Sequence, residues 1–371
     1  MSLSAARRLV VKVGSALLVD DTSGRLDAAW LATLAADLAD LRAKGAEVVV
    51  VSSGAIALGR LALGLPPRRL MRLEQQQAAA CVGQVFLAQG WTDAFSAHGI
   101  TAAQLLLTLD DSEERRRYLN ARATLETLLA LGAIPVVNEN DSVATAEIRF
   151  GDNDRLAARV AEMIAADTLV LLSDIDGLYT ADPRRDSSAT HIPEVAAITP
   201  SIEALAGDAI PGHSTGGMVT KLAAGRIAAG AGCRMAIASG RRQHPLRALL
   251  QGSARATWFA ATAAPRSAWK SFVAGGLRPA GALTIDAGAI AALRGGASLL
   301  PAGVRGVEGD FARGDAVRVL APDGAEVARG LANYAAADAA RIAGRRTAEI
   351  EKILGWRGRD ELVHRDDLVL L

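Results

Sequence analysis

Two glycine-bearing loops in this chain of 371 residues each carry a lysine. Lys12 stands just before Gly14 and Ser15 at the end of the apolar run 9–13, and Lys221 closes a second loop that enters a helix. Glycine lets backbone N–H groups approach a phosphate closely, and a lysine adds a point charge. Only five of the 41 basic residues are lysines, and a compact ammonium reaches one phosphoryl oxygen where a planar guanidinium would not fit. The pattern predicts a phosphate site, although each loop alone also fits an ordinary solvated cap. The second loop consists of Thr215, Gly216, Gly217, Met218, Val219, Thr220 and Lys221.

Two further polar stretches could hold a small polar ligand. Ser53 and Gly54 follow the apolar run 48–51 and open a helix, where free N–H groups and hydroxyls bind a carboxylate or simply cap the helix. Acidic and amide residues are concentrated at 138–141 and 151–154, a composition suited to binding an amino group, a metal or both. A polar surface loop is the alternative for these two segments.

Ser173 and Asp174 follow the apolar run 169–172 and fit either a nucleotide-facing loop or a simple turn. The five histidines are scattered, without metal-ligand spacing and without a nucleophile elbow nearby. A reaction that lacks an obvious base suits a nucleophile that is already ionised. A side-chain carboxylate with a pKa of about 4.3 meets that condition at neutral pH. Phosphoryl transfer to such a group depends mainly on positioning and charge neutralisation.

The elements that must position these residues alternate between strand and helix. The runs 9–13, 48–51, 134–137 and 169–172 are apolar on both faces, and helical patterns separate them. This alternation predicts an α/β fold with a largely parallel sheet sandwiched between helices. Ligands of such sheets bind in the loops at the carboxyl ends of the strands.

The pattern of apolar residues and glycines changes after residue 260, and this change predicts two domains. Residues 1–260 form the predicted α/β domain, and residues 261–275 show no periodicity and resemble a linker. Residues 276–371 combine short strand-like runs, closely spaced glycines and two helical patterns, which predicts a small β-rich domain.

Composition limits the setting and the partners. The chain has 41 basic and 40 acidic residues, two cysteines and no uncharged apolar run of about 18 residues. We therefore expect a reduced, cytoplasmic protein without a signal peptide, a membrane span or a disulfide framework. The alternative to an enzyme is an RNA-binding protein that acts through the C-terminal part. Residues 275–371 carry 13 basic and 13 acidic residues, whereas nucleic-acid sites usually have a basic surplus, so the charge argues against this alternative.

Taken in order, these motifs resemble the amino-acid kinase family over nearly the whole chain. The paired Asn-Glu-Asn-Asp at 138–141 and Gly-Asp-Asn-Asp at 151–154 is far more specific than either glycine loop. The C-terminal part resembles a PUA domain in segments 286–289, 298–304 and 309–315. The resemblance implies an amino-acid kinase fold followed by a PUA domain.

The resemblance also implies a role for each site residue. Lys12 and Lys221 flank the transferring phosphoryl group, and Asp154 holds both lysines by ion pairing. The implied glutamate-binding residues are Ser53, Gly54, Asp141, Asp152 and Asn153. The implied ATP-binding residues are Lys12, Gly14, Ser15, Ser173, Asp174, Thr215, Gly216, Gly217, Met218, Val219, Thr220 and Lys221.

The implied activity is ATP-dependent phosphorylation of the γ-carboxylate of L-glutamate to L-glutamyl 5-phosphate, the first step of proline biosynthesis. It implies ATP and Mg²⁺ as cofactors, with Mg²⁺ bridging the β- and γ-phosphates and few or no fixed protein ligands. It further implies L-proline as a feedback inhibitor and a homo-oligomer, dimer or tetramer. Other members act on aspartate, N-acetylglutamate, carbamate or UMP, and the sequence does not display the pocket shape that selects among these acceptors.

Overall fold

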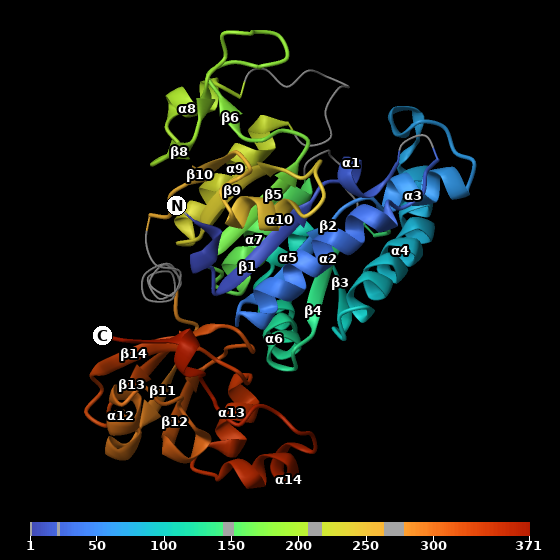
Figure 1. The fold of residues 1–371 in the computed structure, drawn as a ribbon. Coiled ribbons are helices and arrows are strands. Elements are labelled where there is room, and N and C mark those ends of the chain that lie inside the picture. Colours follow the sequence, from blue (N-terminus) through green and yellow to red (C-terminus); the bar gives the residue numbers. More distant parts are fainter. Residues whose placement is uncertain (1, 21–22, 144–151, 207–216, 263–277) are drawn as a thin grey trace. The chain divides into compact units, whose positions relative to one another are not determined.

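The chain divides into two compact units, Met1–Pro265 and Arg266–Leu371 (Figure 1). The computed structural model describes residues 2–20, 23–143, 152–206, 217–262 and 278–371. Each unit encloses buried apolar clusters of its own. The predicted linker 261–275 lies mostly outside the described residues, so the predicted domain limits stay predictions.

The described residues of the first unit form an eight-stranded sheet in the order β3-β4-β2-β1-β5-β9-β10-β8. The six strands from β3 to β9 run parallel to one another, whereas β10 is antiparallel to β9. This arrangement confirms the predicted, largely parallel sheet. The strands are β1 (Arg8–Val13), β2 (Glu47–Ser52), β3 (Ala102–Leu107), β4 (Ile134–Glu139), β5 (Thr168–Ser173), β8 (Glu194–Val195), β9 (Arg234–Ser239) and β10 (Ala256–Phe259), and a separate hairpin joins β6 (Leu178–Tyr179) to β7 (His191–Ile192).

Helices cover both faces of this sheet. Side chains alternate across a strand, so Val11 of β1 packs in the cluster that includes α2, α4 and α10, and Val10 packs with α6, α7 and α9. Burial on both faces explains why the strands read as continuous apolar runs. The helices are α1 (Ser15–Leu18), α2 (Ala28–Ala43), α3 (Ala55–Ala62), α4 (Leu73–Ser96), α5 (Leu109–Glu113), α6 (Arg115–Ala130), α7 (Asp152–Met163), α8 (Pro200–Ala204), α9 (Met218–Gly230) and α10 (Pro245–Leu250).

Two element boundaries differ from the sequence prediction. Strand β4 continues to Glu139, so Asn138 lies in the strand and not in the loop that follows it. Helix α7 begins at Asp152, and Asn153 and Asp154 therefore belong to its first turn. Asn138 and the residues from Asp152 to Asp154 therefore lie in regular structure, which fixes their backbone more firmly than a loop would.

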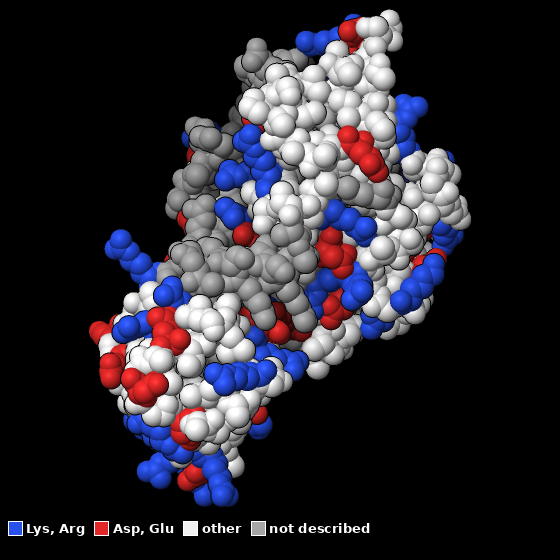
Figure 2. All heavy atoms as spheres, turned by 90° about the vertical axis from the view of Figure 1, so that its left-hand side faces the viewer, with Lys and Arg blue, Asp and Glu red and all other residues white. Residues whose placement is uncertain are grey.

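The second unit is a small β-rich domain, as predicted. Its described residues form a five-stranded sheet in the order β12-β11-β13-β14-β15, with Leu283, Val317 and Tyr334 in its buried cluster. On the face shown in Figure 2, acidic and basic side chains both appear over this unit. Its elements are β11 (Gly281–Ile285), α12 (Ala287–Arg294), β12 (Val304–Gly309), β13 (Ala316–Leu320), β14 (Glu326–Leu331), α13 (Ala336–Ile342), α14 (Ile350–Leu354) and β15 (Leu368–Leu370).

Across the described part of both units, every helix is too short or too polar to cross a bilayer.

Candidate active site

The carboxyl ends of the parallel strands bring the predicted site residues to one edge of the sheet. Strand β1 lies between β2 and β5, with Val13 level with Ser52 on one side and with Leu172 on the other. Strands β5 and β9 also end together, where Ser173 faces Ser239. Ligands of open α/β sheets bind beyond the carboxyl ends of the strands, so this edge is the candidate site.

Asp154 lies between the two predicted lysines. Its Oδ1 is 2.7 Å from Lys12 Nζ, and its Oδ2 is 3.2 Å from Lys221 Nζ. Thr220 Oγ1 lies 3.1 Å from the same Oδ2. The three charged residues are almost fully buried, with exposures of 0% for Asp154, 3% for Lys221 and 6% for Lys12. Strand β1, the start of α7 and the first turn of α9 therefore meet at one carboxylate.

Burial and charge act against each other in this cluster. Burial alone would raise the pKa of Asp154, but the ammonium groups of Lys12 and Lys221 hold that pKa below its ordinary value. Burial lowers the pKa of Lys221 more than the attraction of Asp154 raises it, and repulsion from Lys12 adds to the lowering. Two ammonium groups against one carboxylate leave a net positive charge. An anion placed beside both lysines would be strongly attracted, because buried charges are poorly screened.

A chain of amide and hydroxyl groups lies next to the lysine pair. Asn153 Nδ2 donates to Ser53 Oγ at 2.8 Å and to Asn138 Oδ1 at 3.1 Å. Asn138 Nδ2 in turn donates to Gln84 Oε1 on α4 at 2.8 Å. Asn153 Oδ1 is buried and has no hydrogen-bond partner among the residues that the structure describes. Buried acceptors are normally paired, so this oxygen is available to a ligand donor such as an ammonium group.

The two turns that carry Ser15 and Ser53 pack against each other. Gly54 has φ +109°, a left-handed conformation that glycine adopts with least strain. A Cβ at Gly54 would lie 3.2 Å from Val19 Cγ2 and 3.9 Å from Ser15 Cα. Ser53 N also donates to Val13 O at 3.1 Å. The start of α3 and the start of α1 are therefore neighbours at this edge.

The predicted nucleotide side is built from β5 and the start of α9. Ser173 is buried, and its Oγ donates to Asp174 Oδ1 at 3.0 Å. Asp174 is exposed, and its charge opposes the effect of burial on the pKa of Lys221. Gly217 caps α9 without a side chain, and Thr220 N donates to Gly217 O at 3.1 Å. The first turn of α9 therefore contains Met218, Val219 and Lys221.

The Amino acid kinase family matches residues 7–239, which is more than half of the chain. This chain belongs to that family. The PUA domain matches residues 281–354, in the second unit. Both matches confirm the resemblance drawn from the motifs, and the first places all the predicted site residues inside the amino acid kinase segment.

Relatives are similar to this amino acid kinase over its full length. A protein of Paramagnetospirillum magneticum named glutamate 5-kinase is 60% identical over 368 residues, covering 99% of both chains. A protein of Rhizobium meliloti named glutamate 5-kinase 1 is 60% identical over 369 residues, covering 100% of this chain and 93% of its own. A glutamate 5-kinase of Rhodospirillum rubrum is 60% identical over 361 residues, covering 97% of this chain and 96% of its own.

Some predicted residues of the kinase site lie beyond the structural description. Thr215 and Gly216 fall outside the described residues, and Asp152 is described only by its backbone at the start of α7. Asp141 is buried, 8% exposed, two residues beyond the end of β4. The roles assigned to all the site residues stay predictions, whereas the positions above are observations.

Two residues of the amide chain were not predicted to belong to the site. Asn138 was part of a noted motif, and a polar residue at the end of an apolar run was a usable signal. Gln84 is 54 positions away on a long helix and gave no signal, because only folding brings α4 beside β4. Trp91 of the same helix donates through Nε1 to Ser52 Oγ at 3.0 Å and supports the end of β2.

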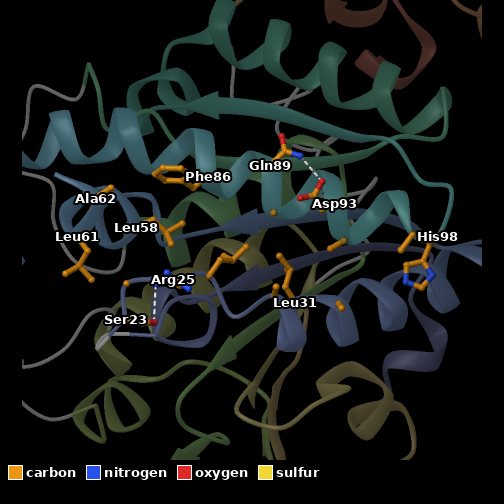
Figure 3. A pocket seen from close by; sticks show the side chains of 17 residues that line it. Ser23, Arg25, Leu31, Leu58, Leu61, Ala62, Phe86, Gln89, Asp93 and His98 are labelled. Atoms are coloured by element: carbon orange, nitrogen blue, oxygen red, sulfur yellow. Dashed lines mark hydrogen bonds between the residues drawn. The ribbon is translucent and has the colours of Figure 1, made fainter. Parts of the chain in front are cut away.

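A cavity of about 720 Å³ lies between α2, α3 and α4 and is separate from the kinase site (Figure 3). Its walls are mainly apolar and include Leu31, Leu58 and Phe86, and Gln89 is hydrogen-bonded to Asp93 at its rim. None of the predicted site residues that the structure describes lines it.

Proposed function

We propose that this chain transfers the γ-phosphoryl group of ATP to the γ-carboxylate of L-glutamate, giving L-glutamyl 5-phosphate and ADP. The observation that carries the proposal is the buried pair Lys12 and Lys221, held by Asp154 at the carboxyl edge of the sheet. Full-length relatives at 60% identity that are named glutamate 5-kinase support the choice of acceptor. The product is an acyl phosphate, and the reaction would serve as the first step of proline biosynthesis.

The two lysines supply the charge that phosphoryl transfer requires. Negative charge spreads over the equatorial oxygens of the transferring group in the transition state. Lys12 approaches from the end of β1 and Lys221 from α9, so the two ammonium groups can flank that group from different elements. Asp154 fixes both ammonium groups before ATP binds, which avoids reorganisation during the reaction. In this role it is a positioning residue.

The acceptor needs no catalytic base. The γ-carboxylate of glutamate is ionised at neutral pH, with an ordinary pKa of about 4.3. One carboxylate oxygen attacks the γ-phosphorus, the bond from that phosphorus to the β–γ bridging oxygen breaks, and ADP leaves with the electron pair. No proton is transferred, so the reaction requires no general base beside the two lysines and their paired aspartate.

The amide chain beside the lysines is the proposed glutamate site. Asn153 and Ser53 are hydrogen-bonded to each other, and the free acceptor Asn153 Oδ1 suits the α-ammonium group of an amino acid. Asp141, two residues beyond the end of β4, would add an acidic acceptor. Gly54 lets the backbone at the start of α3 approach the substrate, and Asp152 completes the proposed set.

The opposite side of the lysine pair is the proposed ATP site. Gly14 and Ser15 at the start of α1 would contact phosphate, as would the loop from Thr215 to Lys221. Ser173 and Asp174 would face the nucleotide from the end of β5. Mg²⁺ would enter as part of the MgATP substrate, with few or no fixed protein ligands. Bound in that form, it neutralises charge on the β- and γ-phosphates.

Three further parts of the proposal concern regulation, assembly and setting. L-proline would inhibit by competing around the glutamate site. A homo-oligomer is supported by Val85 and Phe86 on α4, which are 68% and 50% exposed although apolar. A cytoplasmic setting is supported by the two free cysteines, Cys81 and Cys233.

The deciding experiment measures ADP release by the purified protein with MgATP and one acceptor at a time. The acceptors are L-glutamate, L-aspartate, N-acetyl-L-glutamate and UMP, and hydroxylamine is present to trap an acyl phosphate. We expect glutamate-dependent ADP release together with a trapped hydroxamate. Activity with another acceptor alone would overturn the proposed substrate and keep the phosphoryl site, and no activity with any acceptor would overturn the proposed function.

A further inference from the structure

Arg241 lies in the loop that follows β9, at the same edge of the sheet as the lysine pair. We propose that Arg241 binds a phosphate of ATP and that Trp30 on α2 is the positioning residue of its loop. The inference rests on the proposed function for the identity of the ligand. It adds a third basic residue to the site, from an element that none of the sequence motifs marked.

The backbone of this loop is attached to the end of β5. Gly240 N donates to Ser173 O at 2.8 Å, which continues the pairing of β5 with β9 beyond Ser239. Arg241 Nε donates to Asp174 O at 3.2 Å. These contacts place the guanidinium against Ser173 and Asp174, the residues proposed to face the nucleotide.

The other side of the loop packs against α1. A Cβ at Gly240 would lie 2.4 Å from Leu17 Cδ1 and 3.2 Å from Leu172 Cβ, so the loop touches the helix that begins at Ser15. Arg241 therefore follows a residue packed between Leu17 of α1 and the end of β5. These two elements also carry Ser15 and Ser173, which are proposed to contact phosphate and nucleotide.

The guanidinium of Arg241 is free to bind an anion. The side chain is exposed, and its two terminal nitrogens have no partner among the described residues. Lys12 and Lys221 share Asp154 and keep one net positive charge between them, whereas ATP carries several negative charges. A planar guanidinium binds phosphate through two parallel hydrogen bonds, which suits Arg241 to the β-phosphate of ATP, next to the γ-phosphoryl group that the lysines flank.

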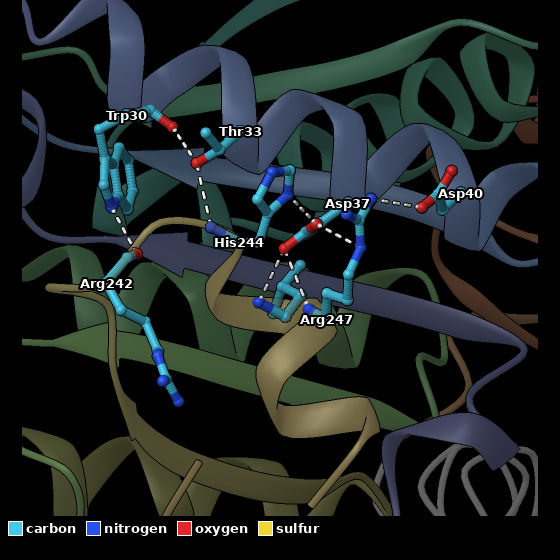
Figure 4. A network of polar contacts seen from close by, with 8 residues as sticks. Trp30, Thr33, Asp37, Asp40, Arg242, His244 and Arg247 are labelled. Atoms are coloured by element: carbon cyan, nitrogen blue, oxygen red, sulfur yellow. Dashed lines mark hydrogen bonds and ion pairs between the residues drawn. The ribbon is translucent and has the colours of Figure 1, made fainter. Parts of the chain in front are cut away.

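Trp30 holds the loop from the side of α2 (Figure 4). Trp30 is 5% exposed, and its indole Nε1 donates to Gly240 O at 2.7 Å and to Arg242 O at 3.2 Å. One turn further along α2, Thr33 Oγ1 accepts from His244 N at 3.1 Å. The loop from Gly240 to His244 is thus fixed at both ends by one helix.

Arg242 offers a matched control for Arg241. It is the next residue, has the same charge and is also exposed. Its guanidinium is engaged elsewhere, because Nη1 donates to Ser253 O at 3.1 Å. Substituting each arginine by alanine removes the same charge at positions one residue apart, so a difference between the variants reports the contact and not the net charge.

The test measures the dissociation constants of MgATP and of AMP by calorimetry, together with KM for ATP and for glutamate. For Arg241→Ala we expect roughly 10-fold weaker MgATP binding, since a charge-assisted hydrogen bond is lost, and a clearly smaller effect on AMP, which carries one phosphate. KM for glutamate should stay unchanged. Arg242→Ala should bind MgATP as the unmodified chain does, and Arg241→Lys should recover part of the loss.

The positioning role has its own readout. Trp30→Phe keeps an aromatic side chain but removes the N–H and part of the buried ring system, and we expect MgATP binding to weaken severalfold with only a modest fall in melting temperature. The double variant Trp30→Phe/Arg241→Ala should bind no more weakly than Arg241→Ala alone, because both changes act on one contact. Fully additive losses would overturn the positioning role.

Three results would overturn the assignment of Arg241. The first is equal weakening of MgATP and AMP binding by Arg241→Ala. The second is an equal effect of Arg241→Ala and Arg242→Ala on MgATP binding. The third is a change confined to KM for glutamate. Failure of the proposed function would look different, because the unmodified chain would then form no hydroxamate with glutamate. Nucleotide binding by the two arginine variants could still be compared in that case.

Discussion

At the scale of single residues, the site depends on one carboxylate that pairs two ammonium groups. Asp154 is fully buried, and its charge is stable there only because Lys12 and Lys221 are within 2.7 and 3.2 Å. Removing one member of a buried pair usually costs more than the pair contributes, because the remaining charge is left without a partner. Substitutions here should therefore change both turnover and stability, and two predictions separate these effects.

The first prediction concerns Lys221. Lys221→Ala should lower kcat for glutamate-dependent ADP formation by about 10² to 10³, the usual loss when one donor to transition-state charge is removed. Lys352→Ala, an exposed position on α14, is the control and should leave kcat unchanged. Steady-state kinetics with a melting curve for each variant checks this. Equal kcat in the two variants would contradict the phosphoryl-site assignment.

The second prediction concerns pH and Asp154. The pKa of Asp154 is lower in the folded chain than its ordinary value of about 3.9, so its ionised form stabilises the fold at higher pH. That stabilisation is complete above the unfolded pKa and is lost as pH falls through the folded pKa. Asp154→Asn should reduce the free energy of unfolding by roughly 3 kcal/mol at pH 7, with a smaller difference below about pH 4. Denaturant unfolding from pH 7 to pH 3 measures it, and a difference independent of pH would refute it.

At the scale of elements, helix contacts between distant segments fix the edge of the sheet. Helix α2 caps α10, since Asp37 Oδ2 accepts from the backbone N–H groups of Leu246 and Arg247 at 3.0 Å each (Figure 4). His244 Nδ1 lies 2.8 Å from Asp37 Oδ1. Helix α10 follows the loop that carries Arg241, so this cap also holds one end of that loop.

The third prediction compares two aspartates of α2. Asp37→Ala should lower the free energy of unfolding by about 3 kcal/mol, because the buried N–H of Leu246 and the partly buried N–H of Arg247 lose their acceptor. Asp40→Ala removes only an exposed ion pair with Arg247 and should cost less than about 1 kcal/mol. Chemical denaturation of both variants gives the comparison. Similar losses in the two would show that the cap contributes no more than a surface pair.

Close packing of α3 against α4 is the second element-scale feature. A Cβ at Gly59 would lie 1.8 Å from Ala79 O, and a Cβ at Gly83 would lie 1.7 Å from Ala55 O. Glycine at these two positions lets the backbones of the helices approach each other. The approach matters for the site because α3 begins directly after Gly54, and α4 carries Gln84.

The fourth prediction tests this packing. Gly59→Ala should lower the free energy of unfolding by about 2 to 3 kcal/mol, because the new methyl group meets backbone atoms, and should raise KM for glutamate by moving the start of α3. Gly230→Ala at the end of α9 is the control, since nothing lies within 4 Å of its Cβ, and should gain about 0.5 kcal/mol. Denaturation and kinetics on both variants measure these effects. Stability gains in both would exclude the close approach.

At the scale of the whole molecule, the kinase site belongs to one unit. All the site residues lie within Met1–Pro265, and each unit encloses its own buried clusters. The second unit matches the PUA domain, and residues 275–371 carry 13 basic and 13 acidic residues, so we still expect that RNA is not its partner.

The fifth prediction follows from this separation. A chain that ends at Pro265 should fold and keep kcat within roughly threefold of the full chain, because it retains every proposed substrate contact. The measurement is glutamate-dependent ADP release, with circular dichroism to confirm the fold. A folded but inactive fragment would show that the second unit contributes to the site.

Much of the fold and part of the site could be read from the sequence. The apolar runs predicted parallel strands because a strand buried on both faces cannot alternate with polar residues. Glycine and lysine at the end of one such run and in a loop that enters a helix predicted a phosphate site, and the order of motifs indicated the family. These signals are local, and each depends on residues a few positions apart.

Only the tertiary structure decided which distant residues meet. Asp154 and Lys221 are 67 positions apart, and their contact depends on the packing of α7 beside α9. Gln84, Trp30 and Arg241 carried no local signal, because their contacts are made across helices and strands that fold together from remote parts of the chain. Sequence periodicity determined the elements, since it reflects burial along one segment, whereas the site arose from the three-dimensional order of the strands.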